Sequence, residues 1–351
     1  MSTATASVAL QSRPLPSRLA DLFRGRRELL LAIVVLLACL VLAIANPTFL
    51  SAAHLFGLGR SSAVIGIMAL GVLLVLLTGG IDVSVSAIAV SAMYLTVVTL
   101  RALDFQGTFL VAVGLSVMIG ALLGLVNGVL VAWLKLPSMI VTIGTLTLYR
   151  GALLAFVGTE RIRQLPSQIG DFSTSSVFTT QSAGRTVSLH TAVLVLVVLA
   201  IILALILRRV WWGRFVYAIG DDEEAASRMG VPVHTIRTGA FVASGALAGL
   251  AGILYAGMNR AADPSTFSGV ELTVLAAVVL GGAAVAGGRG SVLGTMLGVV
   301  LITVVGSSLV LIGIPAAWQS LFIGLFVLLG VCAPAIRERR VERRRGMVVS
   351  E

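Results

Sequence analysis

The sequence is a succession of apolar runs of about twenty residues, and this repetition constrains the fold more than any other feature. As a helix, a run of that length spans the hydrocarbon core of a bilayer, where a backbone must satisfy its own hydrogen bonds. Such runs lie near 29–45, 61–78, 83–101, 109–134, 138–157, 189–207, 235–258, 271–286, 290–312 and 318–333. The sequence therefore predicts an all-α integral membrane protein, a polytopic helical bundle of about ten transmembrane helices.

Composition agrees with this fold class. Hydrophobic residues make up 58% of the chain and charged residues 11%, whereas about a quarter of the residues of a soluble domain are charged. The 38 glycines fit membrane helices, in which Gly permits close contacts. Cys39 and Cys332 lie in or beside apolar runs near opposite ends of the chain, so we expect no disulfide between them.

The distribution of basic residues predicts the orientation. Ten spans place both ends of the chain on one side, and most Lys and Arg residues fall on that side. The net charge of +10 therefore reflects membrane orientation, not nucleic-acid binding, and both termini are expected in the cytoplasm. The opposite side holds Arg60, Arg101, Arg161, Arg163, Arg185 and Arg260.

This orientation divides the chain into a disordered cytoplasmic tail (1–28), a transmembrane domain (29–333) and a basic cytoplasmic tail (334–351). The first apolar run follows three arginines and ends in Ala43-Ile44-Ala45, which is similar to a signal peptide. We favour an uncleaved span because the run is long for a signal sequence.

Two long loops interrupt the spans: a Ser/Thr-rich external loop (158–188) and a cytoplasmic loop (208–234). The cytoplasmic loop contains the run Gly220–Val231, which holds four of the fifteen acidic residues. Asp221 or Asp222 can cap a short helix there, with acids near its positive end and Arg228 near its other end. An exposed charged helix between two spans suits contact with another protein. The alternative is a solvated linker.

The sequence also excludes several kinds of chemistry. Lys135 is the single lysine and does not follow a Gly-rich turn, so the chain has no nucleotide-binding P-loop. His54, His190 and His234 lack Cys or carboxylate partners at ligand spacing, so no metal and no cofactor are expected. No nucleophile motif is present. We expect that this protein is not an enzyme and that a separate chain hydrolyses any ATP it uses.

Polar residues inside apolar runs are costly and tend to be functional. Asp82 follows the helix break Gly79-Gly80 and can either cap the next helix, with Ser84, or line a solute pathway. Asn127 lies in a stripe of glycines at every fourth position, which predicts a close helix contact that Asn127 strengthens by a hydrogen bond. The glycines of this stripe are Gly120, Gly124 and Gly128.

Arg150 falls within a span, where an arginine at the bilayer centre costs about 2.5–3.5 kcal/mol. It is expected to snorkel outward or to pair with Glu271, which begins a span at the same external side. Glu271 can also be simply interfacial. A second glycine pair, Gly281-Gly282, opens a tight cytoplasmic turn.

The chain resembles the permease subunits of bacterial ribose-type sugar ABC importers. That group also includes importers of rhamnose, xylose, arabinose, galactose and autoinducer-2. The resemblance covers roughly residues 60–331. It rests on three segments in order: TGGIDVSVSAI (78–88), NGVLVAWLKLPSMIVTIGTLTLYRG (127–151) and VELTVLAAVVLGGAAVAGGRGSVLGT (270–295).

The resemblance implies a bacterial inner-membrane location and a pathway formed by two permease subunits, identical or different. It also implies an ABC ATPase on the cytoplasmic side and an extracytoplasmic sugar-binding protein. The family's coupling helix, an Ala-rich stretch with an acidic start, matches Asp222, Glu223, Glu224, Ala225, Ala226, Arg228 and Gly230.

The chain departs from the family pattern at two places. Ser86 stands where the family often has Gly, and the interval from Arg228 to Gly230 is one residue shorter than usual. The main alternative function is an ion-coupled secondary transporter, for which Asp82 is the one candidate carboxylate. A membrane-embedded enzyme would need clustered His, Asp or Glu residues, which the sequence lacks. The sequence does not identify the solute.

Overall fold

The computed structural model describes residues 27–182 and 185–311, together with positions 318, 321, 324, 325 and 328. Residues 1–26 of the expected N-terminal tail, most of the expected tenth span (318–333) and the whole tail 334–351 lie outside the described residues. Cys332 lies outside them as well. The expected tenth span and the orientation of the termini therefore stay predictions.

The described part of the chain is mostly helical, as predicted. Seven of its helices are long and apolar enough to cross a membrane, and two shorter apolar helices follow them. In chain order, the seven long and two shorter apolar helices are α2 (Arg27–Ala45), α3 (Ala52–Leu77), α4 (Val85–Ala102), α5 (Phe109–Ala132), α6 (Ser138–Ala152), α8 (Thr191–Arg209), α11 (Val233–Asn259), α12 (Val270–Leu280) and α13 (Val292–Leu311).

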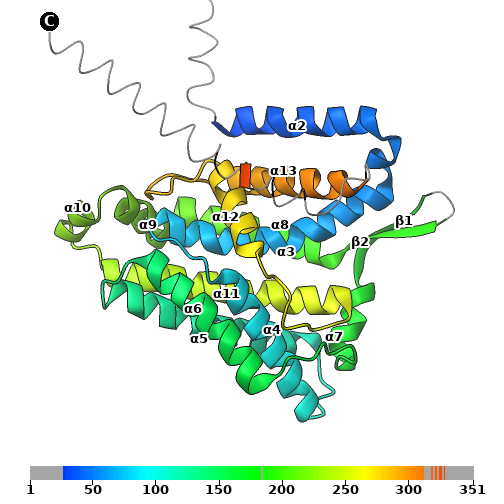
Figure 1. The fold of residues 1–351 in the computed structure, drawn as a ribbon. Helices are drawn as coiled ribbons and strands as arrows, with labels where there is room; N and C mark the ends of the chain where they lie inside the picture. Colours follow the sequence, from blue (N-terminus) through cyan, green and yellow to red (C-terminus); the bar gives the residue numbers. More distant parts are fainter. Residues whose placement is uncertain are drawn as a thin grey trace, which may run out of the picture.

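Shorter elements connect these helices. They are η1 (Pro47–Leu50), η2 (Leu153–Val157), α7 (Ser167–Asp171), η3 (Phe172–Thr174), β1 (Ser176–Ser182), β2 (Arg185–His190), α9 (Trp211–Asp221) and α10 (Glu223–Arg228). The ribbon β1–β2 and the helix α10 lie at opposite ends of the bundle (Figure 1).

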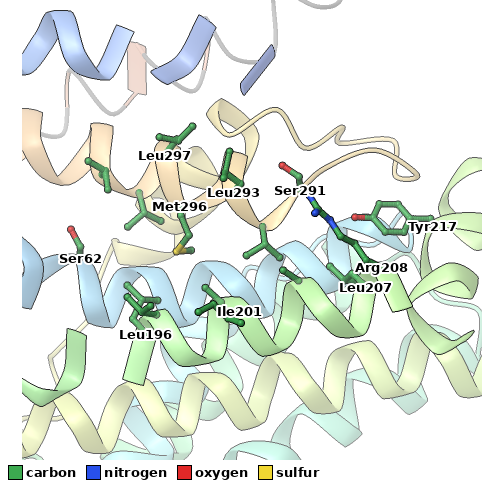
Figure 2. Close-up of a pocket in the computed structure, with 16 residues that line it drawn as sticks. Ser62, Leu196, Ile201, Leu207, Arg208, Tyr217, Ser291, Leu293, Met296 and Leu297 are labelled. Atoms are coloured by element: carbon green, nitrogen blue, oxygen red, sulfur yellow. The ribbon is translucent and has the colours of Figure 1, made fainter. Parts of the chain in front are cut away.

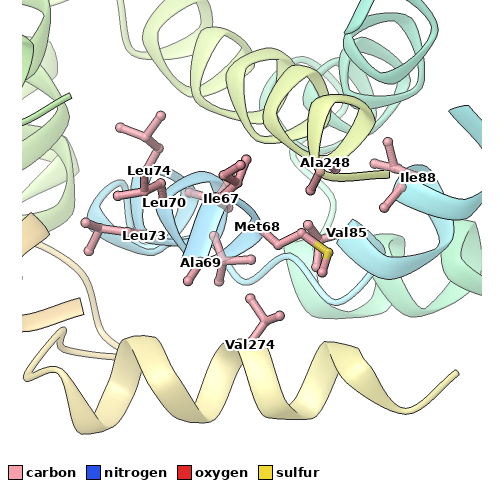
Figure 3. Packing of buried hydrophobic residues seen from close by; sticks show 14 of the residues in the cluster. Ile67, Met68, Ala69, Leu70, Leu73, Leu74, Val85, Ile88, Ala248 and Val274 are labelled. Carbon is pink, nitrogen blue, oxygen red and sulfur yellow. The ribbon is translucent and has the colours of Figure 1, made fainter. Parts of the chain in front are cut away.

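Two helices, α3 and α11, form the centre of the bundle. Figure 1 shows α11 between α3 on one side and α4, α5 and α6 on the other. Figure 3 shows Met68 and Ala69 of α3 packed among side chains of α4, α11 and α12. Met68, Ala69, Ala248 of α11 and Val274 of α12 are fully buried. Burial of this apolar surface inside protein makes the central helices a rigid frame for the polar groups at either end.

The predicted glycine stripe brings α5 against α11. A Cβ atom on Gly120 would lie 2.2 Å from the Gly245 carbonyl oxygen, and one on Gly124 would lie 2.3 Å from that of Phe241. A Cβ atom on Gly128 would lie 2.9 Å from the Cα atom of Thr238. The two backbones therefore touch at all three glycines, as in small-residue membrane interfaces.

The loop 158–188, predicted to be external, contains strands that the sequence did not predict. Strands β1 and β2 pair antiparallel, from Ser176 opposite His190 to Ser182 opposite Arg185. The strands are rich in Val, Phe and Thr, which favour extended backbone. A lone two-stranded ribbon is only marginally stable in water. This one packs against α3, where the rings of Phe56 and Phe178 meet edge to face with their centroids 6.4 Å apart.

Helix limits differ from the predicted spans where a cap or a glycine overrides hydropathy. The predicted run 61–78 begins earlier as α3, because the Ser51 side chain accepts a hydrogen bond from the His54 N–H and caps the helix. The predicted run 271–286 stops at Leu280, because Gly282 adopts a left-handed conformation with φ +91°.

Candidate functional site

A buried polar network surrounds Asp82 at the start of α4. The Asp82 Oδ1 atom accepts hydrogen bonds from the Ser84 N–H (3.0 Å) and hydroxyl (2.7 Å), and Oδ2 accepts one from the Ser244 hydroxyl (2.9 Å). Asn127 Nδ2 donates to the Ser84 hydroxyl at 2.7 Å, and the Tyr149 hydroxyl lies 3.4 Å from Asn127 Oδ1. The network joins α4, α5, α6 and α11.

The sequence left two interpretations of Asp82, a cap for the next helix or a residue that lines a solute pathway, and this geometry bears on both. Its carboxylate receives three hydrogen bonds and the residue is only 2% exposed, so it lies within the packing of four helices. Ser84 turns its hydroxyl to Asp82 and makes no side-chain capping bond to α4. Ser244 and Tyr149 were missed by sequence reasoning, because a hydroxyl in an apolar run gives no signal of a distant partner.

A second cluster contains the predicted partners Arg150 and Glu271. Arg150 Nη2 lies 3.7 Å from Glu271 Oε2 and donates to the Phe267 carbonyl oxygen at 2.8 Å. The Ser86 hydroxyl donates to Glu271 Oε2 at 2.7 Å and accepts from Arg150 Nη2 at 3.3 Å. The structure thus brings Arg150 and Glu271 together, and Ser86, the departure from the family's Gly, bridges them.

Two glycine-rich turns and the last turn of α9 meet near the end of the bundle that carries α10. The Gly288 N–H donates to the Leu77 carbonyl oxygen at 3.1 Å, which joins the turn after α12 to the end of α3. A Cβ atom on Gly220, at the end of α9, would lie 1.9 Å from that same Leu77 oxygen and 2.3 Å from the Gly288 nitrogen. Backbone meets backbone there without intervening side chains. We call Leu77, Gly220 and Gly288 the glycine junction.

The four predicted helix-breaking glycines flank this junction. Gly79 and Gly282 have φ values of +78° and +91°, a region that favours glycine. A Cβ atom on Gly281 would lie 2.6 Å from the Gly294 carbonyl oxygen, so this residue packs α12 on α13. A Cβ atom on Gly80 would lie 3.0 Å from the Val75 side chain.

The predicted coupling segment forms the short helix α10. Asp222 Oδ1 accepts from the Ala225 N–H at 2.9 Å and caps the helix. Its other end closes at Gly230, with φ +82°. Ala226 is fully buried against the bundle. The structure therefore forms the capped helix that the sequence predicts, with Asp222 as its cap.

An arginine that sequence reasoning missed fastens α10 to the bundle. Arg237 of α11 pairs with Glu223 at 2.7 Å and also donates to the Thr78 carbonyl oxygen at 3.3 Å. Glu224 and Arg228 form an i,i+4 pair on the outer side, 78% and 74% exposed. The helix is thus anchored on one side and presents charge on the other. The 14-residue separation of Arg237 from Glu223 gave no local sequence signal.

A cavity of about 570 Å³ with polar and apolar lining lies at the C-terminal end of α11, whereas α10 lies next to the start of that helix. We call it the polar pocket; α3, the last turn of α11, the loop after α11 and the start of α12 form it. Sequence reasoning had assigned none of the lining residues to a solute site; it had noted Arg60 for its charge. The polar side chains that line it are Arg60, Ser61, Tyr255, Asn259, Thr266 and Thr273.

A second cavity of about 570 Å³ runs between α3, α8 and α13 (Figure 2). We call it the apolar groove. Its walls are Leu, Ile, Val, Ala and Met side chains; Ser62 lies toward one end and Arg208, Tyr217 and Ser291 lie at the other. Such a lining suits hydrocarbon and offers few partners to a hydroxylated solute.

The chain is similar to known permeases over most of its length. A family model described as the permease component of branched-chain amino acid transport systems matches residues 54–331. The autoinducer 2 import system permease protein LsrC of Enterobacter sp. (strain 638) is 39% identical over 306 residues, which cover 87% of this chain and 85% of that protein.

The corresponding LsrC proteins of Yersinia pseudotuberculosis serotype O:3 (strain YPIII) and Escherichia coli O9:H4 (strain HS) are 37% and 35% identical. Those alignments cover 86% and 87% of this chain and 82% and 86% of the relatives. No solved structure matches the chain. Together, the family match and these relatives show that the chain belongs to the permease components of ABC importers, membrane subunits that work with a separate ATPase chain.

Proposed function

We propose that this permease imports a monosaccharide or a similar small hydroxylated solute, delivered by an extracytoplasmic binding protein. The observation that carries the proposal is the similarity to autoinducer 2 import permeases over 86–87% of this chain. The same family includes branched-chain amino acid permeases by its description, so leucine is the comparison solute of choice.

In this proposal α10 is the element that receives the ATPase. Its outer side exposes Glu224 and Arg228, while Ala226 and the Arg237–Glu223 pair hold its inner side to the bundle. A helix fixed in this way moves with α11 when a partner pushes on it, which a solvated linker does not do. The side that carries α10 is then cytoplasmic, in agreement with the predicted orientation.

The proposal also states what the other surfaces of the permease contact. Two permease subunits, identical or different, form the pathway, and the ribbon β1–β2 with its neighbouring external loops meets the binding protein. Apolar side chains such as Leu36, Val41 and Ile44 of α2 are exposed, as expected of a helix that faces lipid or another subunit.

Reconstitution tests the function directly. The permease is placed in liposomes with its partner ATPase and binding protein, and uptake of autoinducer 2, ribose and leucine is measured with and without ATP. We expect ATP-dependent uptake of a hydroxylated solute that requires the binding protein. ATP-dependent uptake of leucine alone would contradict the proposed solute class. Uptake by the permease without ATP, driven by a proton or sodium gradient, would instead support the ion-coupled alternative.

A further inference from the structure

We propose that the polar pocket is a binding site for a neutral polyhydroxylated solute, which docks there after release from the binding protein. This inference rests on the proposed function and adds to it a place on the permease where the solute is recognised. The pocket volume of about 570 Å³ is within the usual range for small-molecule sites, roughly 300–1,000 Å³. It leaves room for one sugar ring with bridging water.

The hydroxyl groups of the pocket are free to bind a solute. In the described part of the chain, the side-chain hydroxyls of Ser61, Tyr255, Thr266 and Thr273 have no hydrogen-bond partner. Hydroxyls elsewhere in the bundle commonly bond back to a carbonyl one turn earlier, as Thr303 does to Val299 at 2.8 Å. A group of unpaired hydroxyls facing one cavity matches the donors and acceptors of a sugar.

The pocket also has an apolar wall. The rings of Tyr255 and Phe267 meet edge to face, with centroids 4.8 Å apart. Such rings give the C–H face of a sugar a surface to pack on, while the Tyr255 hydroxyl provides a polar tip. Phe267 has φ +65°, a strained conformation for a bulky residue. Arg150 holds it there by donating to its carbonyl oxygen at 2.8 Å.

The charge of the pocket offers a zwitterionic amino acid a partner for its carboxylate but none for its ammonium group. Arg60 is the single charged side chain among its described lining residues, and its guanidinium donates to the Met258 carbonyl oxygen. The lining therefore offers no carboxylate to pair with the ammonium group of a zwitterion. Neutral hydroxylated molecules fit this lining better than leucine does.

Adjacent serines provide a matched pair of variants. Ser61 lines the polar pocket, whereas Ser62 lines the apolar groove. We expect Ser61→Ala, Tyr255→Phe and Thr273→Val each to lower kcat/KM for uptake of autoinducer 2 or ribose by about fivefold, the effect of one lost neutral hydrogen bond. Ser62→Ala should leave it unchanged. Stimulation of the ATPase by the loaded binding protein should persist in all four variants, which shows that they are folded and coupled.

Thiol protection provides a second measurement that does not depend on uptake. Asn259→Cys, at the pocket rim, is introduced into a chain that carries Cys39→Ala and Cys332→Ala. The rate at which a membrane-impermeant reagent modifies the introduced thiol is measured with ribose, autoinducer 2 or leucine present. We expect protection by at least one of the two hydroxylated solutes and none by leucine.

The outcomes separate this inference from the proposed function. If hydroxylated solutes are imported but the pocket variants match Ser62→Ala and the thiol at position 259 gains no protection, the pocket assignment is wrong while the function stands. If that thiol is protected by leucine alone, or by no solute, the assignment is also wrong. Transport of leucine alone would contradict the function itself.

Discussion

At the scale of single residues, His190 shows how a side chain at the end of a span can fix the start of a helix. Its Nδ1 atom accepts from the Ala192 N–H at 3.1 Å and caps α8, and Nε2 lies 3.0 Å from the Phe172 carbonyl oxygen. The imidazole must therefore be neutral, with its proton on Nε2. Burial and the nearby Arg60 lower the pKa of His190 below its ordinary value, against the opposing effect of the Phe172 carbonyl.

This arrangement predicts a pH-dependent stability. Because the pKa is lowered in the folded state, the contribution of His190 is fully present above the unfolded value of 6.5 and is lost as the pH falls through the folded value. We expect His190→Asn, which keeps a good capping side chain, to flatten the fall in Tm between about pH 7 and about pH 5. Thermal unfolding in detergent measures this, and parallel pH profiles of both proteins would refute it.

Residue-scale predictions from sequence succeeded where the signal was local or charged. Arg150 was expected either to snorkel outward or to pair with Glu271, because an unpaired charge in a span is costly, and the two side chains lie 3.7 Å apart. Ser244 could not be assigned to Asp82, because 162 residues separate them and hydropathy does not record which helices meet. The same holds for the pocket hydroxyls, which gather only after α3, α11 and α12 have packed.

At the scale of elements, the contact between α5 and α11 depends on the absence of side chains. Gly124 faces the α11 backbone, whereas a Cβ atom on Gly114 of the same helix would meet nothing within 4 Å. We expect Gly124→Ala to destabilise the bundle by about 1–3 kcal/mol through overpacking. Gly114→Ala should be neutral or slightly stabilising, because Ala favours the helix by up to about 1 kcal/mol. A lower Tm for Gly124→Ala alone supports this, and equal Tm values would contradict it.

The elements themselves were predictable to different degrees. Long apolar runs located the helices well, because lipid requires a helix of that length. The ribbon β1–β2 was missed, because its short strands sit in a Ser/Thr-rich loop and rely on α3 for support. The glycine stripe predicted a close contact for α5 but could not name α11 as its partner.

At the scale of the whole molecule, the polar pocket and α10 lie at opposite ends of the same two helices, α3 and α11. In the proposed function, solute and ATPase therefore act on one frame from its two ends. We expect Glu224→Arg to abolish ATP-driven uptake while the protein still inserts, because it reverses a charge on the proposed docking side of α10 and repels Arg228. Uptake in proteoliposomes measures this.

The charge swap Glu224→Arg with Arg228→Glu serves as the control. It restores an i,i+4 ion pair within α10, in the orientation that the helix dipole favours less, and exchanges the charges that a partner would meet. If the swap transports normally, the single variant failed through helix stability and the docking role of this pair is wrong. If both fail while membrane levels stay normal, docking is supported.

The glycine junction has a consequence for how sequence variation in this protein is interpreted. Side chains can change rotamer and so accommodate small displacements. The backbones of Leu77, Gly220 and Gly288 are in direct contact and cannot adjust in this way. In a saturation-mutagenesis screen, position 220 should tolerate no substitution, because any Cβ atom there would collide with the Leu77 and Gly288 backbones. Such intolerance resembles the genetic signature of a catalytic residue. Here it would report only that the backbone of α9 lies in direct contact with the end of α3 and with the turn after α12.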